Sequence, residues 1–190
     1  DEGCSVYIKE MKFKEFVKFL EKLEGTASRL EMTDVLVELL KKLNENEVEA
    51  GVYLMMGGLA PRYQKIQFNL ADKMVMRAVA KSVGEKIENV RREYKRVGDL
   101  GEVIKGLKIG LGKRTGGIMS ILEVREKLKV VAEDRGTGSQ ERKIASLAEV
   151  LSEVDPVGAK FVVRIVLDKL RLGYSTKTVL DALSVMEVGD

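Results

Sequence analysis

The sequence contains no histidine, no tryptophan, a single cysteine and only two prolines. Without histidine, the Ser-His-Asp and Cys-His arrangements are excluded, and no side chain has an ordinary pKa near neutrality. A metal site would have to consist of carboxylates alone, so zinc chemistry is not expected. The lone Cys4 has no partner for an internal disulfide. We therefore expect no metal ligands in this chain, and hydrolase chemistry is not favoured.

Long apolar runs and a strong excess of one charge are also missing. The 33 basic residues face 30 acidic ones, so any affinity for nucleic acid has to come from local clusters. The 190 residues, 45% hydrophobic and 5% aromatic, are typical of a helix-rich globular protein. The N-terminus has no signal-peptide features and no membrane span is expected. These features predict an intracellular protein, cytoplasmic or nucleoid-associated if the source is prokaryotic.

Apolar residues recur at spacings of three and four along almost the whole chain, which predicts amphipathic helices and an all-α fold. Phe13, Phe16 and Leu20, for example, share one helical face, and Ser28 with Glu31 is a capping-box pattern before the next helix. No strand alternation competes with these patterns. Helices are expected near residues 11–24, 28–43, 47–57, 70–82, 85–97, 99–105, 118–132, 140–154, 156–168 and 176–186.

The stretch 106–117 contains five glycines and three basic residues, which predicts a flexible linker between halves at about 11–105 and 118–190. It superficially resembles a phosphate-binding P-loop. However, its first glycine lies one residue too far from the Gly-Lys pair, and Arg114 stands where a Ser or Thr would hold magnesium. A nucleotide-binding enzyme is therefore the least favoured interpretation of this stretch.

The two halves are similar when they are compared at a fixed offset of 111 residues. We interpret this similarity as an internal pseudo-twofold repeat of helix pairs, in a compact multi-helix domain, although shared apolar phase explains part of it. Such a repeat suits a ligand with its own approximate twofold, such as duplex DNA. The identical pairs are Ser28/Ser139, Leu36/Leu147, Glu38/Glu149, Leu40/Leu151, Val52/Val163, Leu59/Leu170 and Tyr63/Tyr174.

Small residues precede the helix expected at 140–154, and cations follow in its first turn. Gly138 and Ser139 lie at the helix start, and Arg142 and Lys143 lie just inside it. Backbone N–H groups, the helix dipole, hydroxyls and nearby cations together form a plausible cradle for a phosphate. Simple N-capping by Ser139 uses the same groups, so both interpretations stay open.

A second basic segment follows the helix at 156–168. Lys169 and Arg171 alternate with Leu170 and Leu172, so the cations can face outward while the leucines anchor the turn. Gly173 allows close approach of a ligand to the backbone. A solvated, positively charged helix end has the same composition, and this interpretation also stays open.

Related positions occur in the first half, where Thr26, Ser28 and Arg29 precede one helix and Arg62 follows the next. The cations within 91–96 are spaced like an exposed helix face, and we interpret them as surface. Aromatic residues are too sparse for a platform that stacks single-stranded bases. Contact with the backbone of duplex DNA therefore fits these segments better.

Together these segments resemble the N-terminal DNA-binding domain of ATP-dependent DNA ligases of the archaeal and eukaryotic type. The resemblance runs in order from about Met11 to Leu183, within a domain at 11–190. Residues 1–10 precede it and are expected to be an extension or foreign to the domain. The motifs that carry the resemblance are Leu23–Thr33, Gly98–Gly101, Gly136–Gln140, Lys169–Gly173 and Thr178–Leu183.

The resemblance implies an all-helical domain that binds nicked duplex DNA along the minor-groove backbone. Its parent enzyme would seal 5′-phosphate/3′-hydroxyl nicks in replication, repair and recombination. The family pattern implies backbone contacts from Thr26, Ser28, Arg29, Gly138, Ser139, Lys169, Arg171, Gly173 and Thr178, to which Arg62 and Lys143 are added from their positions near these segments.

Such ligases form a lysyl-AMP on a Lys-x-Asp-Gly motif and use ATP and Mg²⁺. This sequence has no Asp-Gly pair, so the chain by itself is expected to be inactive and to hold no cofactor. The partners that the resemblance implies are nicked DNA, the adenylation and OB-fold domains of the same ligase, and a sliding clamp. An alternative function is a helical-repeat module that binds other proteins, which would bind its partner without salt sensitivity.

Overall fold

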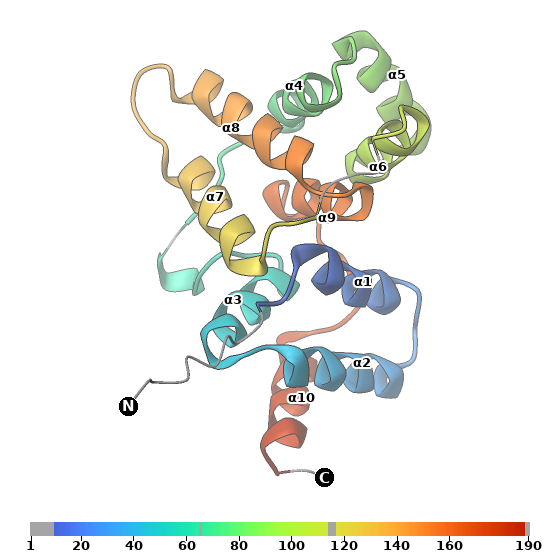
Figure 1. Ribbon diagram of the computed structural model, residues 1–190, viewed down its shortest axis with the longest axis vertical. Helices are drawn as coiled ribbons and strands as arrows, with labels where there is room; N and C mark the ends of the chain where they lie inside the picture. Colours follow the sequence, from blue (N-terminus) through green and yellow to red (C-terminus); the bar gives the residue numbers. More distant parts are fainter. Residues whose placement is uncertain (1–9, 65, 114–116, 189–190) are drawn as a thin grey trace, which may run out of the picture.

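The computed structural model describes residues 10–64, 66–113 and 117–188, and in these ranges the fold is all-α, as the sequence predicts (Figure 1). Cys4 and Arg114, singled out above, lie outside the described residues, as does most of the segment 1–10. The described elements are α1 (Phe13–Glu24), α2 (Arg29–Lys42), α3 (Glu45–Met55), the 3₁₀ helix η1 (Arg62–Gln64), α4 (Asp72–Val83), α5 (Ile87–Val97), α6 (Leu100–Gly110), α7 (Ile121–Glu133), α8 (Ser139–Glu153), α9 (Pro156–Val166) and α10 (Thr176–Val188).

Side-chain caps define several helix starts at the positions that the sequence predicts. The Ser28 hydroxyl accepts a hydrogen bond from the Glu31 N–H at the start of α2. The Glu31 carboxylate does not complete a capping box there, because it accepts a hydrogen bond from the Thr26 hydroxyl instead. Asp155 caps α9 by accepting from the Gly158 N–H, directly before a proline at the first helical position. These caps satisfy N–H groups that have no partner inside the helix.

Helix α9 lies in the middle of the molecule and organises the core (Figure 1). Ten of its eleven residues are buried, and it packs against α1, α6 and α8. From α1, the predicted apolar face with Phe13, Phe16 and Leu20 is fully buried against this core. A helix that is apolar on nearly all sides is expected at such a central position.

The linker that the sequence predicts at 106–117 is wrong in its first part, because α6 continues to Gly110. The reason is a contact between α6 and the C-terminal end of α8. Lys108 is 2% exposed, and its ammonium donates to the carbonyls of Leu151 and Val154, both at 2.6 Å, at the C-terminal end of α8. This buried contact stabilises the last turns of α6 against the preference of glycine for irregular structure.

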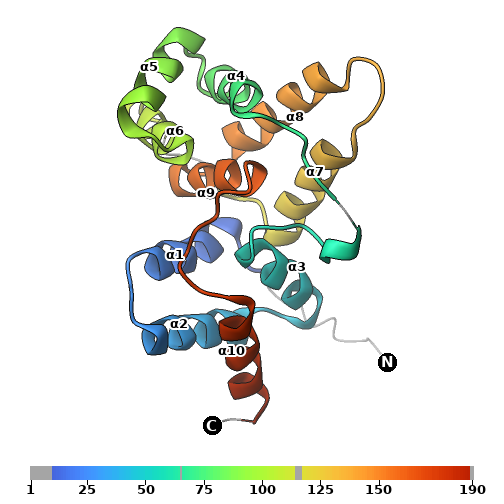
Figure 2. The same ribbon diagram turned by 180° about the vertical axis from the view of Figure 1, so that it is seen from behind.

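The starts of α1 and α7 are joined by two backbone hydrogen bonds. The Phe13 N–H donates to the Met119 carbonyl at 2.9 Å, and the Ile121 N–H donates to the Met11 carbonyl at 3.1 Å. Between them they form an isolated antiparallel bridge of Lys12 with Ser120. Seen from the other side, two extended connections, near residues 66–71 and 167–175, cross the same side of the molecule (Figure 2).

Candidate nucleic-acid interface

The turns that follow α3 and α9 have the same backbone geometry. Gly57 and Asp168 both have left-handed conformations, with φ of +79° and +54°. In each turn the next N–H reaches back to the helix, from Gly58 to the Tyr53 carbonyl at 2.9 Å and from Lys169 to the Arg164 carbonyl at 2.8 Å. A left-handed residue in this place is a common way to end a helix.

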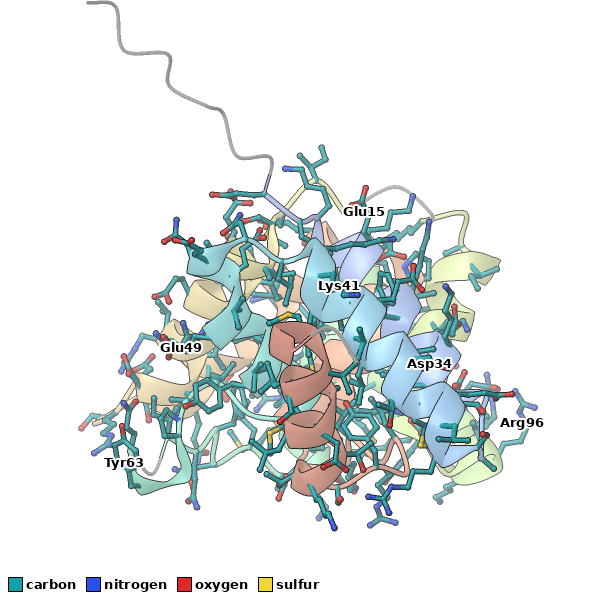
Figure 3. All side chains as sticks on the ribbon, turned by 90° about the horizontal axis from the view of Figure 1, so that it is seen from below. Glu15, Asp34, Lys41, Glu49, Tyr63 and Arg96 are labelled. Atoms are coloured by element: carbon teal, nitrogen blue, oxygen red, sulfur yellow. The ribbon has the colours of Figure 1, made fainter. Side chains whose placement is uncertain are left out.

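These two turns lie in contact with each other, on the side of the molecule that Figure 2 presents. A Cβ at Gly57 would lie only 3.2 Å from the Leu170 Cβ, and the Tyr174 hydroxyl donates to the Met55 carbonyl. Burial raises the pKa of Tyr174. Tyr63, which aligns with Tyr174 at the offset of 111, is instead 79% exposed at the edge of the molecule (Figure 3).

The turn at 167–174 presents its cations as the sequence predicts. Lys169 and Arg171 are exposed, whereas Leu172 is buried and Leu170 is half-buried. Gly173 has φ of +80°, and a Cβ there would lie 3.2 Å from the Met32 Cε of α2. The leucines therefore fix the turn to the body, and the two cations remain at the surface.

The Lys169 ammonium lies 2.9 and 3.1 Å from the two carboxylate oxygens of Asp72, the first residue of α4. The Tyr94 hydroxyl donates to the same carboxylate at 2.8 Å. The hydrogen bond from Lys169 lowers the pKa of Asp72, against the opposing effect of partial burial, and the bond from Tyr94 lowers it further. The same bond raises the pKa of Lys169. Lys169 is therefore a charged ammonium at physiological pH.

The start of α2 lies beside α10. Ser28 and Arg29 are exposed, and Thr26 is half-buried. The Arg29 guanidinium lies 3.2 Å from the Asp181 carboxylate of α10. The Thr178 side chain is buried near the start of α10, with its hydroxyl 3.4 Å from that of Ser175. Hydroxyls and one cation therefore gather where α2 and α10 meet.

At the start of α8, N-capping by Ser139, one of the two interpretations left open by the sequence, is wrong. The cap residue is Gly138, with φ of +76° and no side-chain cap, and Ser139 is already the first helical residue. A left-handed cap suits glycine, which has no Cβ. Arg142 holds this loop by donating to the Asp134 carboxylate at 2.6 and 2.9 Å and to the Thr137 carbonyl at 2.8 Å. The backbone at Gly138 is exposed at a helix N-terminus, where anions are favoured.

Lys143 does not lie at this surface. It is 5% exposed, and its ammonium donates to the carbonyls of Phe68 at 2.7 Å and Ala132 at 3.3 Å, which explains the burial of a charged group. Burial lowers its pKa. Its role is to join α7 and α8 to the connection before α4, so it is withdrawn from the candidate site. Arg62 begins η1, but its side chain lies outside what the structure describes.

A charged cluster that sequence reasoning missed adjoins the turn at 167–174. Lys160 and Arg164, one helical turn apart on α9, form ion pairs with Glu24 of α1 and with Glu102 of α6. Arg164 also pairs with Asp99 at 2.7 Å. The signal was present, since two cations at i and i+4 interrupt an otherwise apolar helix. A cavity of about 280 Å³ is lined by Glu24, Asp99 and Arg164 of this cluster together with Tyr94, Lys169 and Arg171.

In the part of the chain that is described, no helix has the length and apolarity that a membrane span requires. A profile of the protein family described as "DNA ligase N terminus" matches residues 12–184. The chain belongs to the DNA ligase N-terminal family. This confirms the resemblance inferred from the separated motifs, and the match begins and ends within a residue of the limits expected from Met11 to Leu183.

The curated relatives are whole ligases of which this N-terminal domain is one part. The chain is 38% identical over 180 residues to a "Probable DNA ligase" of Dictyoglomus thermophilum, covering 95% of the chain and 30% of the relative. It is 35% identical over 179 residues to a "Probable DNA ligase" of Aquifex aeolicus, and this match covers 94% of the chain and 31% of the relative. "DNA ligase 1" of Methanosarcina mazei is 34% identical over 180 residues, and this match covers 95% of the chain and 30% of the relative. The chain therefore spans about 30% of the length of these relatives.

Proposed function

We propose that this domain binds nicked duplex DNA through the minor-groove backbone, as the DNA-binding part of an ATP-dependent ligase. The observation that carries the proposal is the pair of adjacent turns after α3 and α9, one of which presents Lys169 and Arg171 at the surface. Exposed cations and a glycine with positive φ suit contact with phosphates, which position a protein on DNA without reading its sequence.

The helix starts supply further phosphate-binding groups. Ser28 and Arg29 at α2, and the exposed backbone of Gly138 with Ser139 at α8, belong to the same proposed footprint. Free N–H groups and the helix dipole favour a phosphate at such ends. The proposed contacts are Thr26, Ser28, Arg29, Arg62, Gly138, Ser139, Lys169, Arg171, Gly173 and the backbone at Thr178.

The internal pseudo-twofold repeat is part of this proposal, and the helix bounds support it. Shifting α3 by 111 residues reproduces the bounds of α9, and shifting α2 gives those of α8 to within one residue. The packing agrees, because α2 contacts α10 as α8 contacts α4, and α1 contacts α9 as α7 contacts α3. The paired hydrogen bonds of the Lys12–Ser120 bridge would lie on the axis that relates the halves.

This symmetry would place equivalent helix starts and turns on both sides of a nick, since duplex backbone has its own approximate twofold. Helices α5 and α6 have no counterpart in the scheme. Ligation itself would require the remaining length of the parent protein, including an adenylation domain and an OB-fold domain that use ATP and Mg²⁺. The parent enzyme would then seal nicks in replication, repair and recombination, and a sliding clamp stays a prediction.

The test is fluorescence anisotropy of the purified chain on a nicked duplex at about 50 and 200 mM salt. A protein that neutralises six or more phosphates loses roughly a thousandfold or more in affinity over this range. Steep, salt-sensitive binding supports the proposal. The absence of binding at the lower salt contradicts it and favours the protein-interaction module, whose binding would not depend on salt.

A further inference from the structure

Two of the cations proposed to contact phosphates already hold carboxylates inside the domain. Lys169 binds both oxygens of Asp72, and Arg29 binds Asp181. Both pairs are partly open to solvent, with side-chain exposures of 44% and 39% for the first and 63% and 45% for the second. A phosphate that binds these cations therefore competes with a carboxylate for them.

The first carboxylate is held in place independently of its cation. Asp72 is the first residue of α4, where the helix dipole favours a negative charge. The Tyr94 hydroxyl of α5 donates to it at 2.8 Å. Lys169, in contrast, lies on the turn after α9 and has a long side chain that can swing away. If Lys169 turned to a phosphate, Asp72 would remain beside it as an uncompensated negative charge.

The second pair, between α2 and α10, has its counterpart between α8 and α4 under the proposed repeat, which relates α4 to α10 and α8 to α2. Arg29 and Asp181 join α2 to α10. A further ion pair of Arg77 with Glu141, at 2.8 Å, joins α4 to α8 with the charges exchanged. Lys169 in the second half is thus paired with Asp72 of the first, and Arg29 in the first half is paired with Asp181 of the second.

We propose that Asp72 and Asp181 act as internal counter-ions that compete with DNA phosphates for Lys169 and Arg29, and so limit how tightly the domain binds DNA. This inference rests on the proposed function. An exposed ion pair contributes little net stability, so a duplex that offers many phosphates displaces both carboxylates. Asp72 stays beside the freed Lys169 and repels the bound phosphate. Its negative charge therefore lowers the affinity for DNA.

The test compares Asp72→Asn with the wild-type chain by anisotropy on a nicked duplex. Asparagine keeps an oxygen for the Tyr94 hydroxyl and removes the charge. We expect about three- to tenfold tighter binding of the nicked duplex at about 100 mM salt. Asp181→Asn should act in the same direction. Thermal unfolding verifies that each variant is folded.

Two controls separate loss of the counter-ion from the change in net charge. Glu149→Gln makes the same charge change at a carboxylate that pairs with Lys127 in the second half of α8, and it should tighten binding by less than twofold. In a Lys169→Gln background, Asp72→Asn should tighten binding by no more than Glu149→Gln does. That non-additivity identifies the direct competition for Lys169.

The outcomes separate this inference from the proposed function. If the wild-type chain binds nicked duplex with steep salt dependence but Asp72→Asn equals Glu149→Gln, the counter-ion role is overturned and DNA binding stands. If the wild-type chain binds no duplex at the lower salt, the proposed function fails, and the inference fails with it.

Discussion

Two glycines in α6 should respond to alanine in opposite ways. At Gly101 an added Cβ would lie 2.8 Å from the Lys160 carbonyl oxygen and 3.1 Å from the Arg164 Cγ, because α6 packs closely on α9. Backbone at that distance cannot yield without moving a helix. At Gly106, which is exposed and inside the same helix, nothing lies within 4 Å of the added Cβ.

Gly101→Ala should therefore destabilise the domain by about 1–3 kcal/mol, the usual cost of overpacking. Gly106→Ala should stabilise it by about 0.5–1 kcal/mol, because alanine loses less backbone entropy than glycine in a helix. The free energy of unfolding from urea titrations measures both, and the melting temperature should move by about 2–4 °C per kcal/mol in the same directions.

A neutral Gly106→Ala would refute the helical assignment of this residue and restore the flexible linker that composition predicts. A neutral Gly101→Ala would refute the close contact of α6 with α9. Because both substitutions add one methyl group to the same helix, general effects of the added carbon cancel in the comparison. The difference in sign depends on the local packing alone.

Lys108→Met should lower the free energy of unfolding by about 2 kcal/mol, because it leaves the buried Leu151 and Val154 carbonyls without their donor; a more stable variant in urea titrations would contradict this. Burial lowers the pKa of Lys108 to about 8, so stability should rise between about pH 8 and the ordinary lysine value as the unfolded chain retains the proton, and Lys108→Met should remove that rise. Burial alone would raise the pKa of the Glu24 carboxyl, but the hydrogen bonds that it accepts from Lys160 and Arg164 outweigh burial and lower this pKa. The ionised Glu24 therefore stabilises the fold above about pH 4.5, and this stabilisation is lost as the pH falls through the pKa of the folded state. Urea titrations from pH 6 to about 2.5 should show a smaller decline for Glu24→Gln, and an unchanged decline would contradict the assignment.

Periodicity and local caps made most of the fold predictable. The helices begin near the expected positions because Ser28, Asp99 and Asp155 act through neighbours two or three residues away. The candidate turn at Lys169 and Arg171 was equally local, since its leucines and cations alternate in sequence. Such features can be predicted because all the residues that determine them lie within a few positions of one another in the sequence.

The errors concern contacts between residues distant in sequence. Composition predicts a linker at Gly106, because it cannot show that Lys108 contacts α8, more than 40 residues away in the sequence. The sequence predicts Lys143 as a surface cation, but in the structure it is buried and donates hydrogen bonds to the carbonyls of Phe68 and Ala132. The ion pairs of Lys169 and Arg29 were invisible for the same reason, and they change how the surface would bind.

The salt dependence of binding to a nicked duplex tests the central claim most directly, when the wild-type chain is compared with a Lys169→Gln/Arg171→Gln variant. If both cations contact phosphates, the variant's plot of log affinity against log salt should be less steep than the wild type's by about two units of slope. A matched Lys41→Gln/Lys42→Gln variant, altered at the opposite end of α2 from Arg29, should keep the wild-type slope. An unchanged slope for the Lys169/Arg171 variant would contradict the account.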